Sequence, residues 1–278
     1  MTGPEEQNTY RRRTLSRIIR RVPGEIANRI YDNLSKVIPH SDETLAKDAE
    51  AVWSNLEPGP RSTRLGSHWL GHGWSDETWN EYGSAHLAMI QDAQRMSGRS
   101  TPLKTVMEWG TGGGANASAI CPAVDRYIGV DISSVNLEEV DRQLQSRGLD
   151  NFQPILIPAV SPEDATPAIE NSNKPAVDCF LSTAVYQHLP GREYARRVTK
   201  IARGLLAEDG IAVINIRYWD LKRQIRILRR SYTDNYAAFN KYTVNEFEIE
   251  MARAGFTVME IRMEPLTHHA YFFLKKTA

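Results

Sequence analysis

The chain has 278 residues, which suits one large α/β domain or one domain with a sizeable extension. Its 34 basic and 34 acidic residues give a formal net charge of zero, so we expect neither nucleic acid nor a membrane surface as a partner. No apolar run approaches the ~18 residues of a spanning helix, and the N-terminus lacks the apolar segment of a signal peptide. Cys121 and Cys179 have neither CxxC nor zinc spacing, so we expect reduced core cysteines in a cytoplasmic protein.

The segment from Arg11 to Ile38 has apolar residues at helical spacing, and Pro23 and Gly24 divide it into two predicted helices. Six arginines lie between residues 11 and 21. They form either a solvated helix face or a contact with an anionic surface, and both interpretations stay open. Whether these helices also form a homodimer stays open as well.

The tetrapeptide "SDET" occurs at Ser41–Thr44 and again at Ser75–Thr78, and each copy is typical of a helix start with acids in the first turn. Residues 58–74, between the two copies, are rich in glycine, proline and aromatic side chains, and Tyr82 follows them. Such a loop is seldom a mere connector. It is either a lid that orders over a ligand or a loop buried against the core.

From Lys104 onward, short apolar runs alternate with helical segments, which indicates a parallel sheet covered on both faces. The expected strands are Thr105–Met107, Tyr127–Val130, Pro154–Ile157, Val177–Leu181 and Ile211–Ile216. The expected helices are Ala115–Ile120, Val135–Gly148, Pro162–Glu170 and Arg192–Leu206.

The chain then continues through a basic aromatic insertion, Arg217 to Tyr242, and a predicted helix, Val244 to Ala254. The insertion is either an amphipathic surface helix or a surface for a polar ligand. Two last apolar runs, "FTVMEIRM" and "HHAYFFLKK", are separated by a short turn and predict an antiparallel strand pair that closes the sheet.

The first predicted strand leads into the glycine-rich stretch "MEWGTGGGANASA". Gly110, Gly112 and Gly114 alternate where a strand turns into a helix, a place where backbone N–H groups meet a ligand that approaches closely. Asp131, at the end of the next strand, can accept both hydroxyls of a ribose. A dinucleotide also fits, because Gly110, Gly112 and Ala115 satisfy G-x-G-x-x-A.

Glu108 opens the pattern E-x-G-x-G-x-G, which resembles motif I of class I S-adenosylmethionine methyltransferases. An acid there attracts a cationic ligand and repels a pyrophosphate. The resemblance covers roughly Lys104 to Lys275 and continues at "DCFLSTAVYQHLPGREYARRVTKIARGLLAEDGIAVINI". It implies a seven-stranded, mostly parallel Rossmann-like sheet with helices on both faces and an antiparallel last strand. Residues 1–100 would be a helical N-terminal extension with a lid, and residues 101–278 the cofactor-binding domain.

By this resemblance, Glu108 and the Trp109–Gly112 backbone hold the methionine part of S-adenosylmethionine, Asp131 holds the ribose and Ile132 packs on the adenine. The predicted cofactor site also includes Gly110, Gly112, Gly114, Ser182 and Tyr82. Two alternatives remain: Glu108 is a buried acid that caps the loop, and Asp131 is the N-cap of the next helix.

Motifs that are missing after the fourth strand reduce the number of possible classes of methyl acceptor. No NPPY-like tetrapeptide, Pro-Cys nucleophile or acidic pair occurs there, which argues against base, amide and arginine methylation. Ser182, Thr183 and Ala184 occupy the turn where metal-dependent O-methyltransferases begin a metal triad, so we predict no metal site. Tyr186, Gln187 and His188 follow, where a general base would stand.

We expect His188 to be that base, because histidine titrates near neutrality. The alternative is that "QHLP" caps the next helix. His268 and His269 are weaker candidates because they begin a closing strand. The favoured function is methyl transfer to a hydroxyl of a polar small molecule, a sugar or saccharide precursor. The alternatives are a small-molecule N- or C-methyltransferase, a non-catalytic S-adenosylmethionine-binding module and an NAD(P)-dependent oxidoreductase.

Overall fold

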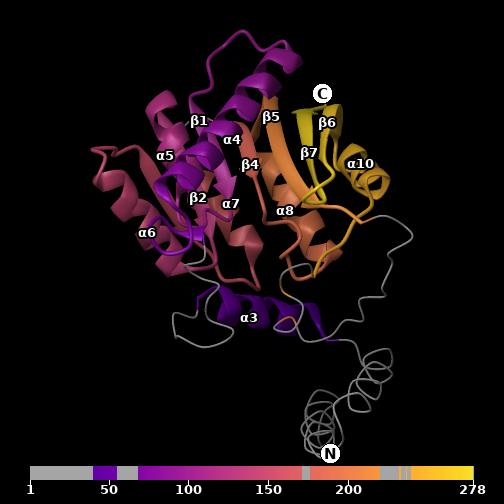
Figure 1. The fold of residues 1–278 in the computed structure, drawn as a ribbon. Helices are drawn as coiled ribbons and strands as arrows, with labels where there is room; N and C mark the ends of the chain where they lie inside the picture. The colour runs from indigo at the N-terminus through magenta and orange to yellow at the C-terminus, as the bar shows by residue number, and fades with distance from the viewer. Residues whose placement is uncertain are drawn as a thin grey trace, which may run out of the picture.

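A computed structural model of the chain describes residues 40–54, 68–170, 176–219, 232, 236 and 239–277. Three predictions fall wholly or partly outside these ranges: the two helices between residues 11 and 38, the first ten residues of the 58–74 loop and most of the 217–242 insertion. The described part is a central sheet with helices packed on both sides (Figure 1).

The sheet has seven strands in the order β3-β2-β1-β4-β5-β7-β6. Strands β1 to β5 pair in parallel, whereas β7 runs antiparallel to both β5 and β6. The predicted seven-stranded, mostly parallel fold with an antiparallel last strand is therefore confirmed. The strands are β1 (Thr105–Trp109), β2 (Arg126–Asp131), β3 (Phe152–Leu156), β4 (Val177–Ser182), β5 (Leu206–Arg217), β6 (Phe256–Glu264) and β7 (His269–Lys276).

The central strands are unbroken apolar runs because helices cover both of their faces. Every residue of β1, β2 and β4 is buried. One face packs against apolar side chains of α4, α5 and α6, and the other against side chains of α7, α8 and α10. These helices are α4 (Asp76–Ser97), α5 (Ala115–Ile120), α6 (Ser134–Gln145), α7 (Ala165–Glu170), α8 (Arg192–Leu205) and α10 (Val244–Arg253).

Both "SDET" copies begin helices, as predicted. The Ser41 hydroxyl accepts a hydrogen bond from the Thr44 N–H at the start of α3 (Asp42–Trp53), and the Ser75 hydroxyl accepts one from Thr78 at the start of α4. Helix α3 crosses one end of the sheet (Figure 1). Helix α4 approaches α5 through Gly83, where a Cβ would lie 2.4 Å from the carbonyl oxygen of Ala115. The close contact requires glycine at this position.

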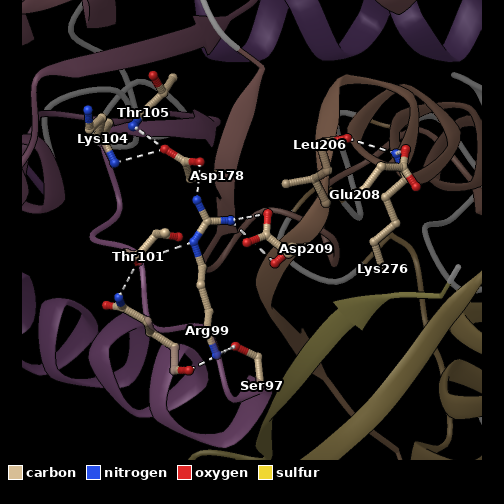
Figure 2. Close-up of polar contacts among 11 residues, drawn as sticks. Ser97, Arg99, Thr101, Lys104, Thr105, Asp178, Leu206, Glu208, Asp209 and Lys276 are labelled. Carbon is tan, nitrogen blue, oxygen red and sulfur yellow. Dashed lines mark hydrogen bonds and ion pairs between the residues drawn. The ribbon is translucent and has the colours of Figure 1, made fainter.

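A partly buried ion-pair network ties the end of α4 to the sheet edge opposite α3 (Figure 2). The Arg99 guanidinium donates to Oδ1 of Asp178 and to Oδ1 of Asp209, each at 2.5 Å. Asp178 also accepts the backbone N–H groups of Lys104 and Thr105, each at 2.8 Å. One arginine thus joins α4 to the starts of β1 and β4 and to the turn before the apolar part of β5.

Cys121 and Cys179 are free and buried, as predicted. No helix within the described ranges is long and apolar enough to cross a membrane.

Candidate functional site

A cavity lies where the strand order reverses. From β1 the chain builds β2 and β3 on one side, while β4 and β5 lie on the other, so the loops after β1 and β4 diverge at the carboxyl edge of the sheet. These two loops, the end of β2 and helix α3 line a cavity of about 450 Å³. Its volume falls within the range of small-molecule sites.

The glycine turn after β1 forms one wall of this cavity. Gly110 has a left-handed backbone (φ 79°), and its N–H donates to the Val130 carbonyl at 2.8 Å. A Cβ on Gly110 would lie 2.5 Å from Cγ2 of Val185 in the loop after β4. Both the backbone angle and the close approach of the two loops therefore require glycine.

Glu108 is buried in the cavity wall, with only 1% of its surface exposed. Oε1 accepts from Nδ2 of Asn116 and Oε2 accepts from the Tyr127 hydroxyl, each at 2.5 Å. Asn116 continues the network, because its Nδ2 also donates to Thr183 and its Oδ1 faces Nδ1 of His86 at 2.8 Å. The carboxylate is thus held from the adjacent strand and from the first turn of α5.

Burial raises the pKa of Glu108 to about 8, although the hydrogen bonds from Tyr127 and Asn116 oppose this rise. The Asp131 carboxylate adds a smaller upward effect. The free site therefore holds a protonated acid at neutral pH that would ionise beside a cationic ligand. A bound ammonium or sulfonium group would favour the ionised form of Glu108.

Asp131 ends β2 on the other side of the glycine turn and is also buried. Its Oδ1 accepts the Ser133 N–H at 2.9 Å, and its Oδ2 accepts longer bonds from Thr111 at 3.3 Å and Asn136 at 3.4 Å. The Gly112 backbone also donates to this carboxylate. Burial is the largest influence on the Asp131 pKa and raises it. Oδ2 retains the capacity to accept shorter bonds from a ligand hydroxyl. The Ser133 hydroxyl, and not the Asp131 carboxylate, caps α6 by accepting the Asn136 N–H.

The described end of the predicted lid loop packs against the glycine turn. His68 and Trp69 lie so close that a Cβ on Gly112 or on Gly113 would come within 2.8 Å or 2.5 Å of their rings, respectively. Trp74 packs against Tyr82 at 4.7 Å between ring centroids, and both line the cavity. The loop is therefore packed over the turn from residue 68 onward; its opening and closing remain a prediction.

His188 lies in the cavity wall contributed by the loop after β4. Its Nδ1 is 2.7 Å from the backbone carbonyl of Tyr236, and a carbonyl can only accept, so Nδ1 carries the proton and Nε2 keeps a lone pair. The Trp53 ring meets the imidazole edge-on at 5.0 Å. Burial lowers the pKa of His188 to about 4, so the ring is neutral at physiological pH.

Nine of the ten predicted site residues line this one cavity: Tyr82, Glu108, Trp109, Gly110, Gly112, Gly114, Asp131, Ile132 and His188. Ser182 does not. Its hydroxyl is fully buried and donates to the Trp109 carbonyl at 3.2 Å, so it supports the glycine turn from behind, while the next residue, Thr183, faces the cavity. Tyr186 also points away, because its hydroxyl pairs with Thr199 in the core.

Sequence reasoning missed the residues that hold Glu108 in place. Tyr127 lies in an apolar run, so the sequence alone indicates a core residue. In the sheet it is two residues before Gly129, the register partner of Glu108, and it therefore lies on the same face of the sheet as Glu108. Asn116 could have been predicted, because it lies in the first helical turn after the glycines. It also missed Arg217, which lines the cavity from the end of β5, beside His269 of β7.

Within the described ranges, no group of three or more His, Cys, Asp and Glu side chains is arranged to hold a metal ion. That the site uses no metal remains a prediction.

A family model described as a methyltransferase domain matches residues 81–261. The match spans well over half of the chain and includes the glycine turn, Asp131 and the loop after β4. It supports the predicted cofactor, S-adenosylmethionine. The two buried carboxylates in one cavity fit such a ligand, since each keeps capacity to accept further hydrogen bonds.

Solved structures with a similar fold include an S-adenosylmethionine-dependent methyltransferase from Clostridium acetobutylicum ATCC 824, with 12% identity, a TM-score of 0.52 and coverage of 77% of this chain and 97% of that one. An O-methyltransferase family protein from Burkholderia thailandensis has 13% identity, a TM-score of 0.51 and coverage of 78% of this chain and 60% of that one. At such identities the likeness shows the fold alone. No curated protein matches the sequence.

Proposed function

The chain belongs to the methyltransferase-domain family, and we propose that it transfers a methyl group from S-adenosylmethionine to a hydroxyl of a polar small molecule. When bound, S-adenosylmethionine supplies a methyl group activated by its sulfonium. The observation that carries the hydroxyl acceptor is that His188, with its Nε2 lone pair, lines the same cavity as Glu108 and Asp131.

The residues of the β1–β2 side hold the cofactor in this proposal. Glu108, fixed by Asn116 and Tyr127, faces the amino group, and Asp131 accepts from the ribose hydroxyls. The backbone of the glycine turn lies along the methionine part, and Ile132 packs on the adenine. Each of these roles rests on the position of the residue in the cavity wall.

The residues of the loop after β4 and the end of β5 face the acceptor. His188 takes the hydroxyl proton at Nε2, and the Tyr236 carbonyl holds Nδ1–H so that the ring keeps this orientation. Trp53, Tyr232 and Tyr236 supply apolar ring surface around a polar centre, which suits a hydroxylated ring such as a sugar or saccharide precursor. Burial of the reacting hydroxyl in this wall excludes water from it.

Incubation of the full-length protein with S-adenosylmethionine and a library of hydroxylated metabolites tests the proposal. We expect S-adenosylhomocysteine to form with an acceptor whose product carries a new O–CH₃ signal in NMR. A product methylated on nitrogen or carbon would show that the acceptor group is not a hydroxyl. Cofactor binding without turnover, with every library member and with a cell extract, would indicate a non-catalytic binding module.

A further inference from the structure

We propose that the methyl acceptor carries an oxyanion, a carboxylate or a phosphate, that is bound by Arg217 at the β5 side of the cavity. The inference deepens the proposed function by naming a chemical class for the acceptor. It rests on Arg217, on the charges around it and on one unpartnered amide oxygen.

Arg217 is the last residue of β5 and pairs in register with His269 at the start of β7. It is half-buried and lines the same cavity as His188. Strand β5 lies beyond β4 from β1, so Arg217 stands on the acceptor side, away from Glu108 and Asp131. An arginine there lies on the side of the cavity that the proposed function assigns to the acceptor.

Among the residues that the structure describes, Arg217 has no carboxylate partner of the kind that other arginines near the sheet have. Arg99, Arg192 and Arg262 each form an ion pair with an acid at 3.0 Å or closer. Within the described residues, no Asp or Glu lies within ion-pair distance of the Arg217 guanidinium. A half-buried guanidinium with five N–H donors and no anion favours a ligand that supplies one.

The charge of Arg217 acts on three basic groups around it. Its charge helps to lower the pKa values of Lys241, His188 and His269, although burial is the larger cause in each case. The Nζ of Lys241 lies 3.7 Å from the centroid of the Trp219 ring. Glu264 is the register partner of His269 on β6; it is exposed, and its charge raises the pKa of His269. A cationic acceptor would be repelled here, and an anionic one would be attracted.

Gln187 supplies an independent sign of a polar ligand in the same wall. Its Oε1 is buried and finds no hydrogen-bond partner among the described residues, although Gln187 lines the cavity. A buried amide oxygen without a donor is costly unless a ligand provides one. An acceptor with a hydroxyl near Gln187 and an oxyanion at Arg217 satisfies both side chains.

The direct test titrates the full-length protein, saturated with S-adenosylhomocysteine, with inorganic phosphate and separately with acetate, and follows tryptophan fluorescence, to which Trp53 in the cavity wall contributes. Arg217→Gln should weaken binding of the preferred anion at least about tenfold, while Arg217→Lys retains part of it. Arg253→Gln, on the exposed surface of α10, is the matched control and should bind as the wild type does. Equal binding in all variants, or none in the wild type, would overturn the proposal.

Competition in the turnover assay then separates the two oxyanions. Glucuronate is compared with glucuronamide, and glucose 6-phosphate with glucose, as acceptors or as inhibitors of the acceptor found in the library. The anionic member of one pair should be favoured at least about tenfold, and Arg217→Gln should remove that preference. A preference for the neutral members would contradict the proposal. The anion titration requires no methyl transfer, so it tests the oxyanion site independently of the proposed function. Failure of the proposed function would instead be seen as absent turnover.

Discussion

The hydroxyl of Tyr127 on β2 donates to Oε2 of Glu108 on β1 at 2.5 Å. This bond joins adjacent parallel strands, and Asn116 donates a second hydrogen bond to the other oxygen, Oε1. The result is an acid that is fixed in position yet protonated at neutral pH, since burial raises its pKa to about 8. This part of the cavity wall is therefore suited to a cationic ligand.

Binding of S-adenosylmethionine should release a proton at pH 7. Free Glu108 is mostly protonated below pH 8, and a bound ammonium favours the ionised form, so affinity should rise with pH up to about 8 and then level off. Calorimetry in buffers of different ionisation enthalpy measures the released proton.

Glu108→Gln is the matched control, because the amide keeps the shape of the side chain and has no titrating carboxyl. It should bind more weakly and release no proton. Proton uptake by the wild type, or the same release in both proteins, would show that Glu108 does not face the cofactor's cationic group.

His188→Ala should lower kcat about 10²–10⁴-fold while the affinity for S-adenosylmethionine stays within a few-fold of the wild type. With a pKa of about 4, His188 is a neutral base throughout the range from pH 5 to 8 and is lost as a base only on further acidification. The kcat of the wild type at saturating cofactor should therefore show no inflection near pH 6.5. Near-normal turnover of the variant would point to catalysis by proximity alone.

Gly110→Ala should reduce both stability and cofactor affinity, because the added Cβ meets Val185 and the backbone is left-handed. Gly148→Ala separates these two causes, since Gly148 has φ 69° but nothing within 4 Å of an added Cβ. It should cost only about 1–2 kcal/mol of unfolding free energy and leave the affinity unchanged. Denaturant unfolding measures the stability of both variants, and calorimetry measures their affinity for the cofactor. Equal affinities would mean that the approach of the two loops is not needed for binding.

Arg99→Met should lower the free energy of unfolding by about 3 kcal/mol, because it leaves the buried Asp178 carboxylate without its cation. Lys47→Met removes an exposed partner of Glu43 and should leave the denaturation midpoint unchanged. Both variants should bind the cofactor as the wild type does, because the Arg99 network joins the starts of β1 and β4, whereas the cavity lies at the carboxyl edge of the sheet. An Arg99→Met protein of wild-type stability would show that the pair is dispensable.

The fold was predictable because its strands are buried on both faces and therefore appear as unbroken apolar runs. The glycine turn was predictable because Gly110 and Gly114 adopt backbone angles that other residues avoid, so glycine is needed at these two positions of the sequence. Helix starts such as Ser41 and Ser75 follow from local capping chemistry.

The side-chain network was not predictable, because it depends on register between strands that are distant in sequence. Tyr127 reads as a core residue until its hydroxyl is placed against Glu108. Ser182 was predicted to belong to the cofactor site, but its hydroxyl donates to the Trp109 carbonyl behind the glycine turn. Arg217 was read as the start of an insertion, and its place in the cavity follows from the pairing of β5 with β7.

The most direct test of the account is calorimetry of the purified protein with S-adenosylmethionine and, separately, with NAD. We predict micromolar binding of S-adenosylmethionine with little affinity for NAD, and a loss of about 1.5–3 kcal/mol of binding free energy in Asp131→Ala, the range for a charge-assisted hydrogen bond. Binding of NAD with no response to S-adenosylmethionine would contradict the assignment of Glu108 and Asp131 to a sulfonium cofactor, and with it the proposed methyl transfer.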